Sequence, residues 1–154
     1  MKTIFLFAIS LASTLSSLAQ ESPKEVCSQF LSILSGTPDK ERDWDYINTH
    51  LTEDAKFAAS NNGKVQNFSG KQFLEIIKKN ASSAPFYEIP VRDSEFVFKN
   101  IAEVKQAYYV YTVDETKKLF GVNMYHLVLQ EGVWKIKTIF WENSPNEGDL
   151  PKKL

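Results

Sequence analysis

The second half of the sequence constrains the fold most strongly, because from residue 86 onward apolar and polar side chains alternate almost without interruption. Alternation of this kind, rich in β-branched and aromatic residues, is typical of strands that bury one face of a sheet. The alternating segments are separated by short turn sequences and cover residues 86–98, 104–113, 119–129 and 133–141. We therefore expect long antiparallel strands at the end of the chain.

The first half carries helix signals instead. Capping boxes over residues 22–25 and 69–72 predict the starts of two helices. Between them, residues 37–39 predict the start of another helix that extends to Leu51, and a short strand over 56–59 is expected to follow. Helices first and long strands afterwards predict an α+β domain, in which one strongly curved, mainly antiparallel sheet wraps the three helices.

A two-residue turn, Glu131-Gly132, joins the last two strands and predicts how they pair. This register places on the inner face the pairs Leu129–Trp134, Leu127–Ile136, Tyr125–Thr138 and Asn123–Phe140. It places on the outer face Val122, Met124, His126, Val128, Lys135, Lys137, Ile139 and Trp141. An exterior this apolar favours contact with a second copy over contact with water. We therefore expect a homodimer through the sheet face.

The chain begins with the pattern of a secretory signal peptide. Lys2 supplies the positive charge, residues 3–15 form a short apolar stretch, and small residues mark a cleavage site after Ala19. Cleavage there leaves a single domain over residues 20–154, with a loose tail from about residue 143. We expect this mature protein to be secreted or periplasmic, with no membrane attachment.

Composition and the rare reactive residues exclude several classes of protein. The 18 basic and 19 acidic residues leave a net charge of −1, which lacks the basic excess typical of nucleic-acid binding. The single cysteine, Cys27, allows no internal disulfide, and its apolar neighbours predict a buried thiol. His50 and His126 stand far apart without a second ligand at metal spacing. Phosphate-binding, dinucleotide-binding and serine hydrolase motifs are absent, so neither a metal nor a cofactor is expected.

Several local segments are similar to one known superfamily when they are taken in order. They are RDWD (42–45), LTEDAKF (51–57), GVWKI (132–136) and IFWE (139–142). With the order of elements, they resemble the nuclear transport factor 2-like superfamily over residues 23–142; it includes ketosteroid isomerase, scytalone dehydratase and SnoaL-like cyclases. The resemblance implies a cone-shaped α+β fold. For enzymatic members it implies a carboxylate, alone or paired with His, desolvated in an apolar cone beside a Tyr or protonated Asp that stabilises an enolate.

Five carboxylates occupy helix or strand positions from which they could face such a cone: Asp43, Asp45, Asp93, Glu95 and Glu142. None of them matches a catalytic pattern of the superfamily. Asp45 borders the apolar face of the second helix, and Asp93 interrupts a predicted strand. These two residues are therefore the candidates for a general base.

A ligand in the cone would also need polar groups that orient it. Asn123, Tyr125 and Thr138 share the predicted inner face, and Trp44 would face them from the second helix. Our leading interpretation is an exported, non-catalytic domain that binds a small apolar ligand at these residues, or a protein partner. The alternative is a SnoaL-like isomerase, cyclase or dehydratase with a pocket carboxylate as its general base.

Overall fold

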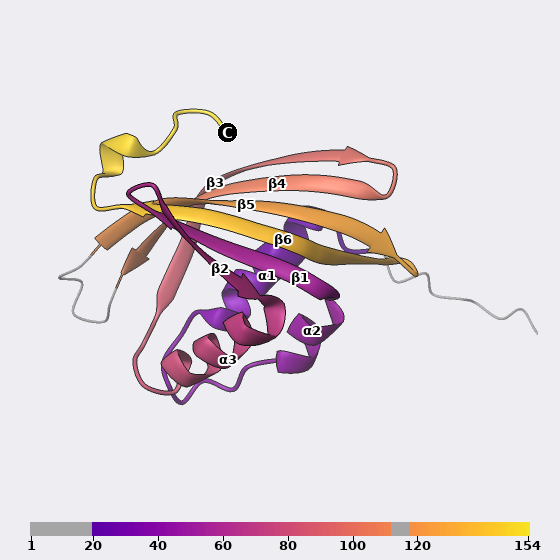
Figure 1. Ribbon diagram of the computed structural model, residues 1–154, viewed down its shortest axis with the longest axis horizontal. Coiled ribbons are helices and arrows are strands. Elements are labelled where there is room, and N and C mark those ends of the chain that lie inside the picture. The colour runs from indigo at the N-terminus through magenta and orange to yellow at the C-terminus, as the bar shows by residue number, and fades with distance from the viewer. Residues whose placement is uncertain (1–19, 112–117) are drawn as a thin grey trace, which may run out of the picture.

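The computed structural model describes residues 20–111 and 118–154 (Figure 1). Its helices are α1 (Pro23–Leu34), α2 (Trp44–Thr49) and α3 (Gly70–Ala81), and a short 3-10 turn, η1, covers Glu147–Asp149. Its strands are β1 (Leu51–Asn61), β2 (Lys64–Ser69), β3 (Tyr87–Phe98), β4 (Ile101–Tyr111), β5 (Lys118–Gln130) and β6 (Val133–Ser144). The predicted signal peptide, residues 1–19, lies outside the described residues, as does the end of the strand predicted over 104–113. None of the described helices combines the length and the apolar character that a membrane span requires.

Both predicted capping boxes form. The Ser22 hydroxyl accepts a hydrogen bond from the Glu25 amide at 3.2 Å, and the Glu25 carboxylate accepts one from the Ser22 amide at 2.7 Å. Ser69 and Gln72 repeat this arrangement at the start of α3. Each box gives partners to amide groups that the first helical turn leaves unpaired. The predicted starts of α1 and α3 are therefore confirmed.

Helix α2 is shorter than predicted. It begins after Asp43, whose carboxylate accepts a hydrogen bond from the Tyr46 amide at 2.8 Å. Ahead of it, the Arg42 guanidinium donates to three carbonyl oxygens and holds residues 37–42 as a loop. Strand β1 starts at Leu51, where the helix was expected to end, and includes the short strand predicted over 56–59. The prediction of a helix from residue 37 to residue 51 is wrong in its bounds.

The strands form one mixed, curled and open sheet with the order β2-β1-β6-β5-β4-β3. Neighbouring strands are antiparallel except β1 and β6, which run parallel. All three helices lie on the concave side of the sheet (Figure 1). The predicted fold class is confirmed: an α+β domain with three helices inside a strongly curved, mainly antiparallel sheet.

The last hairpin departs from its predicted register after two correct pairs. The turn residues Glu131 and Gly132 adopt φ values of 53° and 80°, as a two-residue hairpin turn requires. The observed pairs are Leu129–Trp134, Leu127–Ile136, Tyr125–Ile139 and Asn123–Trp141. The register shifts because a β-bulge leaves Lys137 as an extra residue of β6. Sequence alternation alone contains no signal for that insertion.

A shift of one residue turns every following side chain to the other face of the sheet. Ile139 and Trp141 therefore point into the concave side, whereas Thr138 and Phe140 lie on the outer face. The Thr138 hydroxyl lies 2.8 Å from Nδ1 of His126, which is exposed on that outer face. The predictions of Thr138 and Phe140 inside the cone, and of Ile139 and Trp141 on the exterior, are wrong.

Helix α1 packs its apolar side against the concave face and supplies the centre of the core. Cys27 is fully buried there, as predicted, and burial raises the pKa of its thiol well above the usual value. A thiol kept neutral in this way is a poor nucleophile. The apolar core residues with under 2% of their area exposed are Val26, Cys27, Phe30, Ile47, Ala55, Phe57, Val104, Ala107, Tyr108, Tyr125, Leu127 and Ile136.

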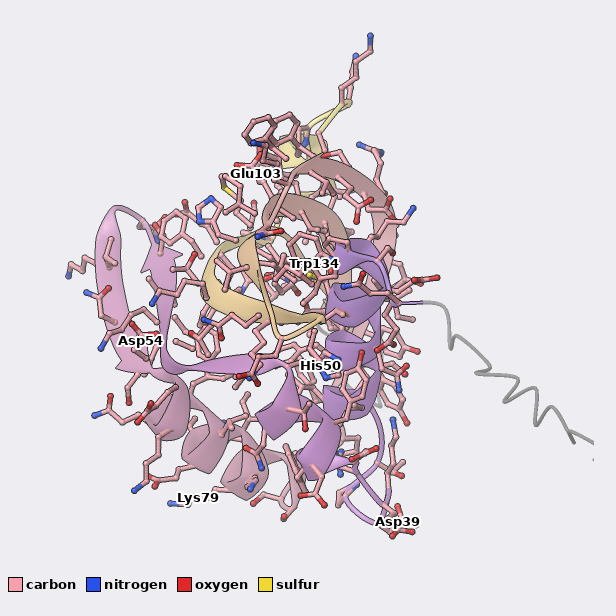
Figure 2. The ribbon with its side chains drawn as sticks, turned by 90° about the vertical axis from the view of Figure 1, so that its right-hand side faces the viewer. Asp39, His50, Asp54, Lys79, Glu103 and Trp134 are labelled. Carbon is pink, nitrogen blue, oxygen red and sulfur yellow. The ribbon has the colours of Figure 1, made fainter. Side chains whose placement is uncertain are left out.

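The outer face of the sheet keeps large apolar side chains in contact with water. Phe96, Phe98 and Ile101 are 64%, 57% and 55% exposed. Phe98 of β3 pairs with Ile101 of β4, and Ile101 pairs with Val128 of β5. Phe98, Ile101 and Val128 therefore form a row across three strands. Figure 2 shows Glu103 of β4 on the side of the sheet away from the helices. This row is one apolar part of the outer face; Phe140, which is 41% exposed, is another.

The end of the chain is ordered along the sheet. Strand β6 continues to Ser144, and η1 then lies on the side of the sheet away from the helices (Figure 1). The Arg92 guanidinium of β3 donates a hydrogen bond to the carbonyl oxygen of Pro151. Strand β6 therefore includes the first two residues of the segment predicted as a loose tail, and Arg92 contacts the segment again at Pro151.

Candidate functional site

A pocket of about 230 Å³ lies on the concave face between the sheet and helices α1 and α3. Its apolar lining consists of Phe30, Leu31, Leu34, Phe73, Ile77, Phe86, Val110, Leu119, Ile139 and Trp141. Its polar lining consists of Glu88, Tyr108, Asn123, Tyr125 and Asn143. Few polar groups in a mostly apolar wall is the usual composition of a small-molecule site.

Glu88 is the one carboxylate among the described residues that line this pocket. It lies on β3 opposite Val110 of β4, at a position that faces the concave side. Its backbone is tied to the end of α1, because the Glu88 amide donates to the Ser35 hydroxyl at 3.1 Å, and that hydroxyl donates to the Glu88 carbonyl at 3.3 Å. These bonds fix the strand where the side chain enters the pocket.

The environment of the Glu88 carboxylate shifts its pKa toward neutral pH. Asn123 Nδ2 donates a hydrogen bond to Glu88 Oε1 at 2.6 Å. Burial disfavours the charged form and raises the pKa of Glu88 to about 7, although the Asn123 hydrogen bond acts in the opposite direction. Glu88 can therefore hold or release a proton near neutral pH, as a general acid or base must.

Two tyrosine hydroxyls accompany this carboxylate. Tyr125 has no exposed area, and its hydroxyl has no hydrogen-bond partner among the described residues. Burial, with the nearby Cys27 and Glu88, raises its pKa well above the usual value, so the hydroxyl keeps its proton. The Tyr108 hydroxyl donates to Asn143 Oδ1 at 2.7 Å. Tyr125 thus retains an unused donor beside the pocket, whereas Tyr108 does not.

Gly121 makes the bond between Tyr108 and Asn143 possible. It lies between them on the inner face of β5, with Tyr108 opposite it on β4 and Asn143 opposite it on β6. A Cβ atom at Gly121 would lie 2.6 Å from the Tyr108 hydroxyl and 2.7 Å from Asn143 Oδ1. Such contacts are far inside van der Waals distance, so the missing side chain lets the two groups meet.

Aromatic rings border the pocket on the side of β2 and α3. Trp141 stacks on Phe68 with ring centroids 6.3 Å apart, and it meets Phe73 edge to face at 5.7 Å. Phe73 also packs against Phe57 at 4.7 Å. Offset stacking and edge-to-face contacts favour fixed ring positions, so this side of the pocket is a rigid wall.

The structure brings together only part of the predicted site. Asn123 and Tyr125 line the pocket, but Thr138 is on the outer face. Trp44 does not line the pocket; it packs at the edge of the core, with Lys78 Nζ 5.0 Å from its ring centroid. The predicted meeting of Trp44 and Thr138 with Asn123 and Tyr125 is therefore wrong.

Neither predicted general base reaches the pocket. Asp45 is an exposed residue in the first turn of α2. Asp93 is also exposed and lies 3.4 Å from Lys24 Nζ in an ion pair. Both side chains are exposed to water, so neither residue has the desolvation that the chemistry needs.

The sequence reasoning missed Glu88, although a signal was present. The segment Phe86-Tyr87-Glu88 alternates, and Phe86 is apolar, so Glu88 shares its face with a residue that belongs in the core. A glutamate at an inward position of a strand is rare without a functional or structural cause. Among the described residues, no group of three His, Cys, Asp or Glu side chains is placed to bind a metal ion.

The chain is similar to solved structures in its fold, although not to known proteins in its sequence. It matches no known family profile and no curated protein. A protein of unknown function from Mycobacterium tuberculosis is 19% identical and superposes with a TM-score of 0.61, over 82% of this chain and 76% of that one. A nuclear transport factor 2-like protein of unknown function from Pseudomonas putida KT2440 is 11% identical, with a TM-score of 0.62 over 85% and 89%.

A third solved structure carries the name of an enzyme. It is a candidate ketosteroid isomerase from Shewanella frigidimarina NCIMB 400, 16% identical, with a TM-score of 0.58 over 80% of this chain and 97% of that one. Identities this low establish a shared architecture and leave activity open. The fold implied by the order of elements is nevertheless confirmed: the chain has the nuclear transport factor 2-like fold.

Proposed function

We propose that the pocket binds a small, mostly apolar carbonyl compound and that Glu88 removes a proton from the carbon next to its carbonyl group. The observation that carries this proposal is the position of one carboxylate, which Asn123 holds at 2.6 Å in the wall of an apolar pocket. Glu88 is partly buried, so part of its hydration is already lost before a substrate arrives. Its pKa of about 7 then lets it alternate between charged and neutral forms at neutral pH.

The proposed reaction moves one proton and one electron pair. The C–H bond breaks, the proton passes to a Glu88 oxygen, and the electron pair moves onto the carbonyl oxygen to form an enolate. The unpaired Tyr125 hydroxyl, next to Asn123, supports this step as the donor to that oxygen. Return of the proton from Glu88 to another carbon gives an isomer. Transfer of that proton to a β-hydroxyl group, which then leaves as water while the enolate electron pair forms the C=C bond, gives a dehydrated product.

The size of the pocket limits the substrate. A cavity of about 150 Å³ accommodates benzene, which has six heavy atoms, so 230 Å³ corresponds to about nine. This volume is below the range of about 300–1,000 Å³ that is usual for drug-sized ligands. A compound with one ring, or two small fused rings, fits, and a four-ring compound does not.

The test uses 1-indanone, a two-ring ketone with acidic hydrogens next to its carbonyl. Exchange of these hydrogens for deuterium in D2O is followed by proton NMR, with the wild type and Glu88→Gln at equal concentration. We expect wild-type exchange to exceed that of Glu88→Gln by about 10²- to 10⁴-fold, the usual contribution of a general base. Glu53→Gln, an exposed change on β1, is the matched control and should leave the rate unchanged.

Two results would count against this function. Exchange by the wild type that is no faster than exchange by Glu88→Gln removes the general base. Binding of 1-indanone without exchange would favour non-catalytic ligand binding, which was our leading interpretation from the sequence. Tyr125→Phe separates the second role: loss of the hydroxyl should slow exchange by about 10²- to 10³-fold if it stabilises the enolate oxygen.

A further inference from the structure

A second hollow of about 580 Å³ adjoins the pocket, under the end of the β1–β2 hairpin. It is lined by Ala59, Ser60, Asn61, Lys64, Val65, Gln66, Leu119, Trp141, Asn143 and Pro145. Three of these residues, Leu119, Trp141 and Asn143, also line the pocket that holds Glu88. The two hollows therefore share a border.

Strand pairing shows that both hollows lie on the concave face. Trp141 pairs with Ala59 of β1, and Ala59 pairs with Gln66 of β2. Trp141 also pairs with Asn123 of β5, which lines the pocket. Side chains at directly paired positions lie on the same face of a sheet, so this row runs from the pocket, across Trp141, into the second hollow.

The two hollows differ in chemistry. The inner pocket is mostly apolar and contains a carboxylate, whereas the outer hollow presents three amides and an ammonium group from Asn61, Gln66, Asn143 and Lys64. Within the described ranges, Lys64 is the one charged residue in the lining of the outer hollow, and it is exposed. The inner pocket is too small for a drug-sized ligand, but the two hollows together fall within the usual range.

We infer that the ligand has two parts: an apolar head of about nine heavy atoms in the pocket, and a flexible tail that ends in an anionic group in the outer hollow, near Lys64. The head rests on the proposed function, because it carries the carbon acid that Glu88 deprotonates. The tail rests on the outer hollow alone and needs no catalysis. Its charge complements Lys64, and its polar atoms meet the amides of Asn61 and Gln66.

The test compares three probes that share one head. They are 1-indanone, 1-indanone with a six-carbon ether chain at ring position 5 that ends in a carboxylate, and the methyl ester of that acid. Dissociation constants are measured by isothermal titration calorimetry. We expect the acid to bind at least tenfold more tightly than 1-indanone. We expect it to bind about 1.4- to fivefold more tightly than the ester, since an exposed ion pair contributes about 0.2–1 kcal/mol.

Lys64→Ala and Lys71→Ala form a matched pair, because both lysines are exposed and only Lys64 lines the hollow. Lys64→Ala should abolish the difference between acid and ester and leave the affinity for 1-indanone unchanged. Lys71→Ala should change neither. The side-chain amide NMR signals of Gln66 and Asn61 should shift on addition of the acid and stay in place on addition of 1-indanone.

An acid that binds no more tightly than 1-indanone overturns the inference, and so does an equal loss of affinity in the two lysine variants. These outcomes are independent of the proposed function. Glu88→Gln should abolish exchange but keep the tail effect, so a missing tail effect with exchange intact refutes only the two-part ligand. A tail effect without exchange refutes only the catalysis.

Discussion

Burial of Glu88 should make the stability of the domain fall as the pH rises. The folded state raises the pKa of this carboxyl from 4.5 to about 7, so between these values the folded state binds more protons than the unfolded state. The contribution of Glu88 is therefore most favourable below about pH 4.5 and is lost as the pH rises through 7. At 1.36 kcal/mol per pKa unit, the full effect is about 3 kcal/mol, and about 2.5 kcal/mol of it falls between pH 5 and pH 8.

Glu88→Gln isolates this contribution. Glutamine keeps the shape of the side chain and can still accept a hydrogen bond from Asn123, but it carries no charge. Other carboxyls act in the opposite direction, since hydrogen bonds to Ser22 hold the pKa of Glu25 below its usual value. Their contributions cancel when the two proteins are compared at the same pH. We expect the variant to gain about 2.5 kcal/mol relative to the wild type between pH 5 and pH 8.

The assay is urea unfolding followed by tryptophan fluorescence at half-unit steps from pH 5 to pH 8. Trp134 is 6% exposed and reports loss of the core. Glu53→Gln removes an exposed carboxylate and should give a curve parallel to that of the wild type. Parallel curves for Glu88→Gln and the wild type would refute the reasoning, because they would mean that the Glu88 carboxylate is hydrated in the folded state.

Three further expectations concern other parts of the chain. Gly121→Ala should cost about 1–3 kcal/mol of unfolding free energy by overpacking, whereas Gly148→Ala, where a Cβ meets no atom within 4 Å, should be neutral in the same urea titration. We propose that the exposed row on the outer face pairs two copies of the chain; Phe98→Asp should then release monomer in sedimentation at micromolar concentration, and Val65→Asp on β2 should not. Export should leave a mature protein whose intact mass begins at Gln20, and a mass that includes earlier residues would contradict the predicted cleavage.

Local signals in the sequence were sufficient for much of the fold. The boxes at Ser22 and Ser69 and the Glu131-Gly132 turn each depend on neighbouring residues, and each formed as predicted. Contacts between residues that are distant in sequence could not be predicted in the same way. The loop before α2 is held by Arg42, and the bulge at Lys137 lies in the pairing of β5 with β6; neither leaves a periodic pattern in the sequence.

The candidate site was predicted less well for the same reason. Asn123 and Tyr125 lie on β5, whose own side chains alternate regularly because the extra residue of the bulge is in β6. Their inward orientation was therefore predictable. Thr138 follows the bulge in β6 and changed face. Asp93 was a candidate base because it places a charge within a strand, but it forms an ion pair with Lys24 at the surface. Glu88 acquires its properties from α1 and Asn123, which are distant in sequence.

The protonation of Glu88 in the folded protein tests the central claim most directly. The δ-carbon of each glutamate is labelled with ¹³C, the Glu88 signal is assigned by its absence in Glu88→Gln, and its chemical shift is followed from pH 3 to pH 9. A desolvated carboxyl in the pocket predicts a midpoint of about 7. A midpoint near 4.5 would mean that water reaches the carboxylate freely, and it would contradict both the pocket chemistry and the proposed role of Glu88 as a base.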